Sequence, residues 1–409
     1  MMTETRGTRE GRFDWWLVTA VYALSLFGLL CIAMARYVPS QSEGLPLLNK
    51  ILNNRSSMWQ SIFILVSPIV IGVVVAIPTE IIKARVRLIY YGVLALLLVT
   101  LVLGQVSNGL RGWLRSDILG RSIQVSEFSK ISILLMLARQ LARSEKPMAK
   151  FKDFMSIMII VGLPVLAVLA QGETGTVIVI AFMFMIMIYF AGVDLRIIIT
   201  FGLLAVIGVG ALVAYGMLSE TTDYRILRLL AFLDPQKYEQ SGGYQILMSQ
   251  KAIGAGQLTG QGTFLPGSWT TLGYVPESST DAVFTVVGES FGFVGCSVVL
   301  LTYLFIILRM TWIARFTRDK FSQLVIIGVV SMLLFHVFQN VAMCMGIMPI
   351  TGIPLPFLSY GGSNMVTNMG GIGLVLNVTR NRSLSDAIST PQTFYNPYRF
   401  STRFKTRPY

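Results

Sequence analysis

The stretch IFILVSPIVIGVVVAI, residues 62–77, contains no charged side chain, and GVLALLLVTLVLG, residues 92–104, repeats this character a short distance along the chain. Similar runs recur throughout the 409 residues, of which 54% are hydrophobic and only 13% are charged. A soluble domain usually carries about 25% charged residues, whereas a helix needs about 20 mostly apolar residues to cross a bilayer. The sequence therefore predicts an all-α polytopic membrane protein built as a single domain.

About ten transmembrane helices are expected, and an even number places both chain ends on the same side of the membrane. They are predicted near residues 14–36, 59–80, 86–106, 126–143, 154–171, 174–192, 196–216, 281–308, 322–346 and 356–379. Lys and Arg gather in the loops on the side of the termini, in the N-terminal segment 1–13 and in the basic tail 381–409. Because basic residues mark cytoplasmic loops, we expect a multi-pass protein of the cytoplasmic (inner) membrane with both termini in the cytoplasm.

The first apolar run, from Trp15 to Met34, is longer than the hydrophobic region of a secretory signal and lacks a convincing cleavage site, so it is interpreted as the first span. The net charge of +13 does not indicate nucleic-acid binding, because its distribution follows the membrane topology. Three cysteines fall in apolar segments without a pairing pattern, so neither a disulfide framework nor a metal cluster is predicted. The one histidine, His336, is expected to pack or to make an interhelical hydrogen bond.

Polar, irregular segments gather on the outward side. The connection 217–280, between spans seven and eight, is predicted to be a large, ordered extracytoplasmic loop. Three further segments break the hydropathy pattern there: residues 108–135, AQGETGT (170–176) and GIPLPFLSYGGS (352–363). Irregular backbone at membrane depth is tolerated where it lines a cavity or is buried in protein, so these segments are candidates for one functional site.

Carboxylates stand out in LGYVPESSTDAVFTVVGESFG, residues 272–292. Asp281 begins an apolar run, and its plain alternative is a helix N-cap. Glu277 could equally be a solvated loop residue. Glu289 lies within the run, where an ionisable residue suggests function, although a structural pair with a Lys or Arg would also explain it.

Basic residues on the outward side are candidates for holding phosphate, since guanidinium and ammonium groups bind it through charge-assisted hydrogen bonds. They are Arg111, Arg115, Lys130, Arg225, Arg228 and Lys251. A phospholipid head group would satisfy them as well as an amphiphilic substrate would.

GIPLPFLSYGGS followed by NMVTNMGGIGLVL resembles the signature of the SEDS family, the shape, elongation, division and sporulation proteins that include RodA and FtsW. The resemblance continues through GYQILMSQKAIGAGQLTGQG (243–262), YVPESSTDAVFTVVGESFGFVG (274–295), VSEFSKISIL and QGETGT, and it covers most of residues 60–380. It implies a ten-span peptidoglycan glycosyltransferase that polymerises lipid II outside the membrane, with a class B penicillin-binding protein (a transpeptidase) as its partner.

The resemblance also implies roles for individual residues. The family's essential aspartate corresponds to Asp281, the expected catalytic base for attack of a sugar hydroxyl on an anomeric carbon. The departing diphosphate needs cations, either Arg and Lys or a divalent ion such as Mg or Mn; no compact metal-ligand motif is present in the sequence. The candidate substrate-binding residues are Arg111, Arg115, Glu127, Lys130, Glu173, Lys251, Glu277, Ser359, Tyr360 and Gly361, with Glu127 and Lys130 expected to form an ion pair.

This chain departs from the family pattern at several positions. Gly112 stands where an arginine usually precedes Trp113, and Val125 replaces a proline. Gly172 and Glu173 replace a Pro-Asp pair, and Ser279 replaces a histidine before Thr-Asp. These departures make a divergent substrate or a weakened enzyme more plausible than in a typical member.

Two rival functions remain open on the sequence. A flippase or transporter of the lipid-linked precursor would distribute ionisable residues through the membrane depth, and a non-catalytic scaffold for the transpeptidase would keep the same fold. The role in elongation, division or sporulation, the metal dependence, the oligomeric state and the role of the tail also stay open.

Overall fold

A computed structural model of the chain describes residues 13–38, 44–52, 54–107, 110–116, 121–218 and 224–380. The segments predicted at the two cytoplasmic ends, 1–13 and 381–409, lie outside these residues apart from Phe13.

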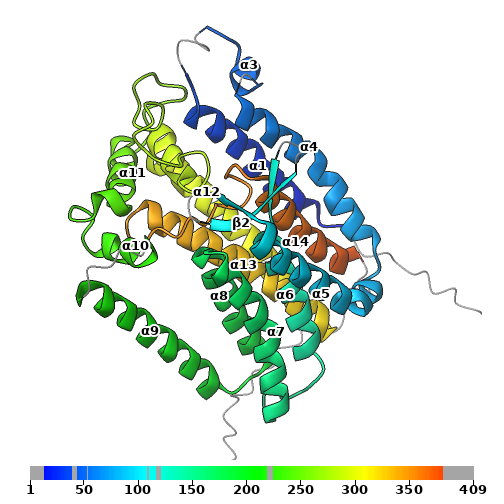
Figure 1. Cartoon of the computed structure of the whole chain (residues 1–409). Helices are drawn as coiled ribbons and strands as arrows, with labels where there is room; N and C mark the ends of the chain where they lie inside the picture. The colour runs from blue at the N-terminus through cyan, green and yellow to red at the C-terminus, as the bar shows by residue number, and fades with distance from the viewer. Residues whose placement is uncertain are drawn as a thin grey trace, which may run out of the picture.

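Long helices form the body of the molecule (Figure 1). Within the described residues they are α1 (Trp15–Ala35), α4 (Arg55–Ala76), α5 (Thr79–Leu103), α6 (Val125–Leu141), α7 (Phe151–Ala170), α8 (Thr174–Ala191), α9 (Leu195–Leu218), α12 (Val283–Arg315), α13 (Lys320–Cys344) and α14 (Gly362–Arg380). Eight of them are long and apolar enough to span a membrane; α6 and α14 are the exceptions. The predicted helical, polytopic membrane fold is confirmed, while the count of ten spans remains a prediction.

Polar side chains define where several of these helices begin. Asp14 accepts a hydrogen bond from the backbone N–H of Leu17 (3.2 Å) and pairs with Arg309 near the end of α12 (2.8 Å). Asp319 similarly accepts from the backbone N–H of Ser322 at the start of α13 (2.9 Å). A carboxylate at a helix N-terminus satisfies unpaired N–H groups and suits the helix dipole, so these residues define helix starts at the end of the bundle predicted to be cytoplasmic.

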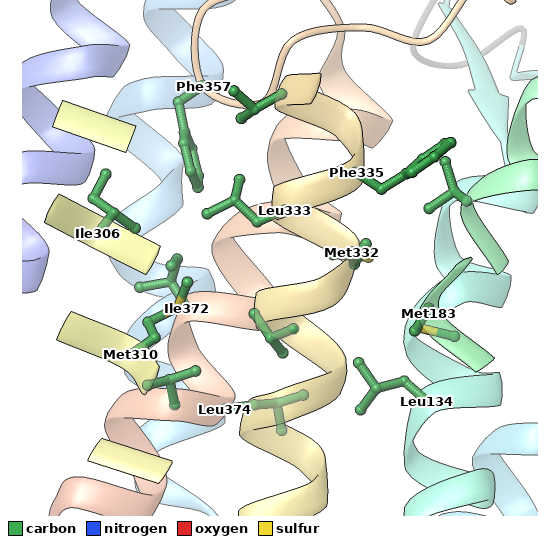
Figure 2. Close-up of a cluster of buried hydrophobic side chains, with 14 of the residues drawn as sticks. Leu134, Met183, Ile306, Met310, Met332, Leu333, Phe335, Phe357, Ile372 and Leu374 are labelled. Carbon is green, nitrogen blue, oxygen red and sulfur yellow. The ribbon is translucent and has the colours of Figure 1, made fainter. Parts of the chain in front are cut away.

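Helix α13 lies at the centre and packs against α6, α8, α12 and α14. Figure 2 shows Met332 and Leu333 of α13 between apolar side chains of the surrounding helices. These neighbours are Leu134 of α6, Met183 of α8, Ile306 and Met310 of α12, and Ile372 and Leu374 of α14. All of them are buried and belong to the main apolar cluster around α13, beside a smaller cluster of Leu97, Val125, Ala167 and Val168.

The outer surface of the bundle is apolar. Large side chains such as Leu65, Val102, Leu166 and Leu301 are exposed on α4, α5, α7 and α12. Helix α9 lies at the edge of the bundle (Figure 1), and Gly216 is its only buried residue. An apolar surface of this kind suits lipid chains rather than water.

A small antiparallel sheet precedes α6 and is not predicted by the hydropathy pattern. Its strands are β1 (Gln105–Ser107), β2 (Leu110–Ser116) and β3 (Arg121–Gln124), in the order β1-β2-β3. Trp113 pairs with Gln124 and Arg115 with Ser122. The sheet packs against α5 and α6 at the end of the bundle predicted to face outward, where the sequence indicated only a polar, irregular segment.

Short helices lie at the top of the molecule (α3) and along its left side (α10 and α11) in Figure 1. They are α3 (Leu47–Leu52), α10 (Tyr224–Leu233), the 3-10 helix η1 (Glu239–Ser241) and α11 (Gly243–Ala255). A coil then runs from Gly256 to the start of α12.

Helix α12 is broken at Gly292, whose φ of 61° and ψ of −160° are not helical. The backbone of the coil binds the break directly. Gln261 and Gly262 donate N–H groups to the carbonyls of Glu289 and Ser290 (2.9 and 3.1 Å), and Phe293 donates to Gln257 (2.9 Å). A helix interrupted in a membrane needs such substitutes for its missing hydrogen bonds.

Candidate functional site

Asp281 lies in the connection that leads into α12, at the end of the bundle predicted to face outward. Helix α12 begins at Val283, and its N-cap is Ala282, with no side-chain cap hydrogen bond. The N-cap alternative for Asp281 is therefore wrong, and its carboxylate is available for another role.

The backbone around Asp281 is held by side chains from distant segments. The Asn340 side-chain amide on α13 donates to the carbonyls of Asp281 (2.6 Å) and Ile353 (2.8 Å). The Ser359 hydroxyl donates to the carbonyl of Thr280 and accepts from the backbone N–H of Leu355 (2.8 Å). Buried polar groups paired in this way hold a loop in one conformation.

Two other predicted residues of the Pro-rich motif complete this support. The Tyr360 backbone N–H donates to the carbonyl of Ser279 (2.9 Å), and the Gly361 N–H donates to the Gln60 side chain (3.3 Å). Ser359 is buried, so its place in this structure is behind the Asp281 loop. These contacts make the motif a support for the loop.

The Asp281 carboxylate is close to a cation from α10. A Cβ built on Gly352 would lie 3.3 Å from Asp281 Oδ2 and 3.8 Å from Arg228 Nη1, so both groups face the same glycine. Loss of hydration, and then the nearby Glu277, raise the pKa of Asp281 to about 6, while Arg228 opposes the shift. Such a carboxyl is mostly ionised at neutral pH and yet basic enough to accept a proton.

Glu277 lies in the same turn and is exposed. Its φ of +51° is unusual for a residue with a side chain, and its carbonyl accepts hydrogen bonds from Thr280 (3.1 Å) and Ala282 (3.0 Å). Its carboxylate accepts from the Thr280 hydroxyl (2.9 Å). Glu277 therefore shapes the turn and adds negative charge beside Asp281.

A second polar cluster lies on α6 and α13. Lys130 Nζ is 2.8 Å from Glu127 Oε1, and both side chains are buried, which confirms the predicted ion pair. Lys130 Nζ also lies 2.9 Å from His336 Nε2, and His336 Nδ1 lies 2.6 Å from the carbonyl of Met332. If Nδ1 carries the hydrogen for that carbonyl, Nε2 accepts from the ammonium, so His336 makes the interhelical hydrogen bond expected of it.

Glu173, at the start of α8, joins this second cluster. Its Oε2 accepts hydrogen bonds from the Ser126 hydroxyl and from the Thr176 hydroxyl (3.3 Å). Burial raises the pKa of Glu173, with the nearby Glu127 acting in the same direction. A Cβ on Gly112 would lie only 1.7 Å from Glu173 Oε1, so the carboxylate packs against that glycine.

The two clusters are separate but share α13. His336 of the second cluster and Asn340 behind Asp281 are one helical turn apart on that helix. The ion pair of Glu127 and Lys130 lies within α6, so the contact that joins α6 to α13 is the one between Lys130 Nζ and His336 Nε2 (2.9 Å). Helix α13 thus carries both His336 of the second cluster and Asn340, which supports the Asp281 backbone.

The structure does not bring every candidate to Asp281. Lys251 is exposed on α11, with its Nζ 5.9 Å from the centre of the Trp269 ring. Arg111 and Arg115 belong to β2, but their side chains lie outside the described part of the structure, as does that of Arg225 on α10.

Glu289 has a structural role. It accepts hydrogen bonds from the backbone N–H groups of Trp269 (2.6 Å) and Thr270 (3.1 Å) and from the Thr270 hydroxyl (2.6 Å). Among the described residues it forms no ion pair with Lys or Arg, so the expected pairing alternative is not what satisfies it. Glu289 ties the coil before α12 to the first half of that helix.

Three contributing residues were not singled out from the sequence: Arg36, Gln60 and Asn340. The Arg36 Nε donates to the Ser279 hydroxyl (3.2 Å). The Asn340 side chain on α13 bonds to the backbone carbonyl of Asp281, and the Gln60 side chain on α4 bonds to the backbone of Gly361 in the motif that supports the loop. The sequence could have indicated these residues because they are polar and lie in or at the end of apolar spans, where a polar group needs a partner in the bundle.

A divalent cation at this site has no evident set of protein ligands. Across the described ranges, no three His, Cys, Asp or Glu side chains come together as a metal-ligating group. A cation near Asp281 is the guanidinium of Arg228.

The chain is similar to known proteins over most of its length. Residues 15–384 match the model of the cell cycle protein family of FtsW, RodA and SpoVE. The chain is 33% identical over 317 residues to the peptidoglycan glycosyltransferase MrdB of Escherichia coli (strain K12), covering 77% of this chain and 84% of MrdB. It is 34% identical over 278 residues to the stage V sporulation protein E of Bacillus subtilis (strain 168), covering 68% of this chain and 73% of that protein.

Among solved structures, a chain described for the structural coordination of polymerization and crosslinking by a peptidoglycan synthase complex superposes with a TM-score of 0.72. It is 25% identical in sequence, and the match covers 90% of this chain and 98% of that one.

Proposed function

This chain belongs to the FtsW, RodA and SpoVE family and is a membrane-embedded peptidoglycan glycosyltransferase, and from that premise we propose that it polymerises lipid II with Asp281 as its catalytic base. The observation that carries the assignment is the carboxylate of Asp281, which caps no helix and has a pKa raised to about 6 beside an arginine. Asn340 holds the backbone carbonyl of Asp281, and Ser359 holds that of the preceding residue, Thr280.

The proposed reaction joins two lipid-linked sugars. The Asp281 carboxylate accepts the proton of the acceptor's 4-hydroxyl, whose oxygen forms the new bond to the anomeric carbon of the donor. The bond between that carbon and the diphosphate breaks, and the diphosphate leaves on its lipid. Arg228, next to Asp281, would stabilise the negative charge that develops on the diphosphate.

Of the predicted substrate-binding residues, Glu277 and Lys251 remain in the proposal as outward groups that could contact the sugars or the diphosphate. Ser359, Tyr360 and Gly361 position the Asp281 loop. Glu127, Lys130 and Glu173 hold α6, α8 and α13 in place behind it. Arg111 and Arg115 stay candidates from β2 on their charge alone.

The proposed setting is the outer face of the cytoplasmic membrane, with both termini in the cytoplasm. The distribution of Lys and Arg supports this orientation. A class B penicillin-binding protein is the proposed partner. Its support is the similarity to a chain of a synthase complex in which polymerization is coordinated with crosslinking.

Two observations favour the enzyme over its rivals. Asp281, Glu277 and Arg228 lie at one end of the bundle, and a transporter would need ionisable groups reachable from both sides. A scaffold does not need a carboxyl such as that of Asp281, whose burial makes its ionisation costly.

The test is polymerisation of purified lipid II by the detergent-solubilised protein with its class B partner. Asp281→Asn should abolish glycan chains while the wild type makes them. Asp234→Asn is the matched control, because Asp234 is an exposed residue of the same large loop and caps the turn at Lys237 (3.1 Å). Equal activity of wild type and Asp281→Asn would overturn the assignment of the base. No product from the wild type with the partner bound would favour the scaffold or transporter.

A further inference from the structure

Arg36 directly follows α1, where it is exposed at the outward end of the bundle. Its Nε donates a hydrogen bond to the Ser279 hydroxyl at 3.2 Å. Ser279 is fully buried and lies close before Asp281 in the chain. The first span therefore brings a guanidinium to the loop that carries the candidate base.

The way in which Arg36 is held leaves most of its donors available. A guanidinium has five N–H groups, and only the one on Nε bonds to Ser279. Within the described residues, Arg36 makes no ion pair with Asp or Glu. Its two terminal nitrogens can together bind two oxygens of one phosphate.

An ordinary helix-end role does not account for this contact. A basic residue after a helix usually interacts with the last carbonyls or with the helix dipole. Arg36 instead bonds across 243 positions of sequence to Ser279, whose own carbonyl accepts from Tyr360 (2.9 Å). The side chain is thus held at the same loop that Tyr360 and Ser359 support.

Arg36 and Arg228 approach the Asp281 loop from different elements. In Figure 1, α1 and α10 lie on different sides of α12, whose N-terminal end follows Asp281. Ser279 has a small side chain, which leaves room beside the loop for the guanidinium of Arg36.

We propose that Arg36 is a substrate-binding residue, which holds a phosphate of the diphosphate on a lipid-linked sugar beside Asp281. The inference rests on the proposed function, since it assigns a ligand to the same site. Arg36 acts on binding rather than on proton transfer, so its loss raises KM more than it lowers kcat.

Three variants separate charge from structure. Arg36→Gln keeps an N–H donor for Ser279 but removes the charge, whereas Arg36→Lys keeps the charge. Lys237→Gln is the matched control, because it removes one positive charge from an exposed site of the large loop, where the Lys237 ammonium lies over the Tyr238 ring. Polymerisation is measured against lipid II concentration in nanodiscs with and without anionic phospholipid.

The expected result is a KM for Arg36→Gln raised about tenfold or more, as for loss of a charge-assisted hydrogen bond. Arg36→Lys should recover part of this loss, and Lys237→Gln should match the wild type. If Arg36→Gln equals the wild type and Arg36→Lys does not, the residue is structural and the proposal is overturned. An effect of Arg36→Gln that disappears in nanodiscs without anionic phospholipid would also overturn it, because the ligand would then be a phospholipid head group.

A direct binding measurement distinguishes this inference from the proposed function. Undecaprenyl diphosphate is titrated onto the wild type and onto Arg36→Gln without any acceptor. If the wild type makes no glycan, the proposed function is contradicted. If Arg36→Gln nevertheless binds this probe more weakly than the wild type does, the inference stands. Equal affinity in both proteins would overturn the inference, whatever the polymerisation assay gives.

Discussion

At the scale of single residues, the pKa of Asp281 leads to a prediction about pH. Its value of about 6 lies above the ordinary value of 3.8, so protonation removes the base as pH falls through 6. We expect kcat/KM to be nearly constant above pH 7 and to fall about tenfold per pH unit below 6. The measurement is the pH profile of lipid II polymerisation.

Glu277→Gln is the control for the cause of that shift. It removes a like charge beside Asp281, so the pKa of Asp281 should fall and the acidic limb of the profile should move to lower pH. A profile with no acidic limb, or one that Glu277→Gln moves toward higher pH, would contradict this account of the site.

Gly112 and Glu173 lead to a second prediction at this scale. A methyl group on Gly112 would meet Glu173 Oε1 at 1.7 Å, and Ser126 and Thr176 restrain that carboxylate. Gly112→Ala should therefore cost about 1–3 kcal/mol of stability, as overpacking does, and lower the melting temperature in detergent. Adding Glu173→Asp shortens the acid and should restore part of the loss.

Because Gly112 packs against the Glu173 carboxylate, this double-mutant cycle also asks whether the two positions depend on each other. Additive effects of Gly112→Ala and Glu173→Asp would show that they do not.

At the scale of elements, the break in α12 links the large loop to the Asp281 segment. Gly292 has a φ of +61° and a ψ of −160°, a combination that costs a residue with a side chain about 1–3 kcal/mol. Its Cβ would also lie 2.4 Å from the backbone nitrogen of Gly260. Gly292→Ala should therefore detach residues 257–262 from the helix and reduce polymerisation at least about tenfold.

Gly92→Ala is the matched control for that variant. Gly92 lies on an exposed face of α5 with nothing within 4 Å of a new Cβ, and alanine there should be neutral or stabilising by up to about 1 kcal/mol. Hydrogen exchange of residues 257–275 reports the detachment directly. Unchanged exchange and activity in Gly292→Ala would mean that the break does not position the loop.

At the scale of the whole molecule, an apolar belt surrounds the bundle and Asp281 lies toward one end. The proposed orientation predicts that a membrane-impermeant maleimide labels Lys237→Cys in intact spheroplasts. Glu145→Cys, in the basic connection between α6 and α7, should react only after permeabilisation. The native cysteines Cys31, Cys296 and Cys344 are replaced first. The opposite pattern of labelling would reverse the topology.

The amino-acid sequence by itself determined the class of the protein and much of its candidate site. Length and apolarity predict helical spans because backbone groups in lipid must pair within a helix. The ion pair of Glu127 and Lys130 also followed from sequence, because residues three apart share a helix face. The resemblance in the Thr-Asp motif indicated Asp281 before any geometry was known.

Only the tertiary structure decided which groups meet. Arg36 and Ser279 are 243 positions apart, and Asn340 reaches Asp281 across 59, so neither contact follows from local spacing. The break at Gly292 depends on backbone hydrogen bonds from another segment, which hydropathy does not reveal. Hydropathy records how each residue partitions between lipid and water, whereas these contacts arise from the packing of helices around α13, where each buried polar group must find a partner.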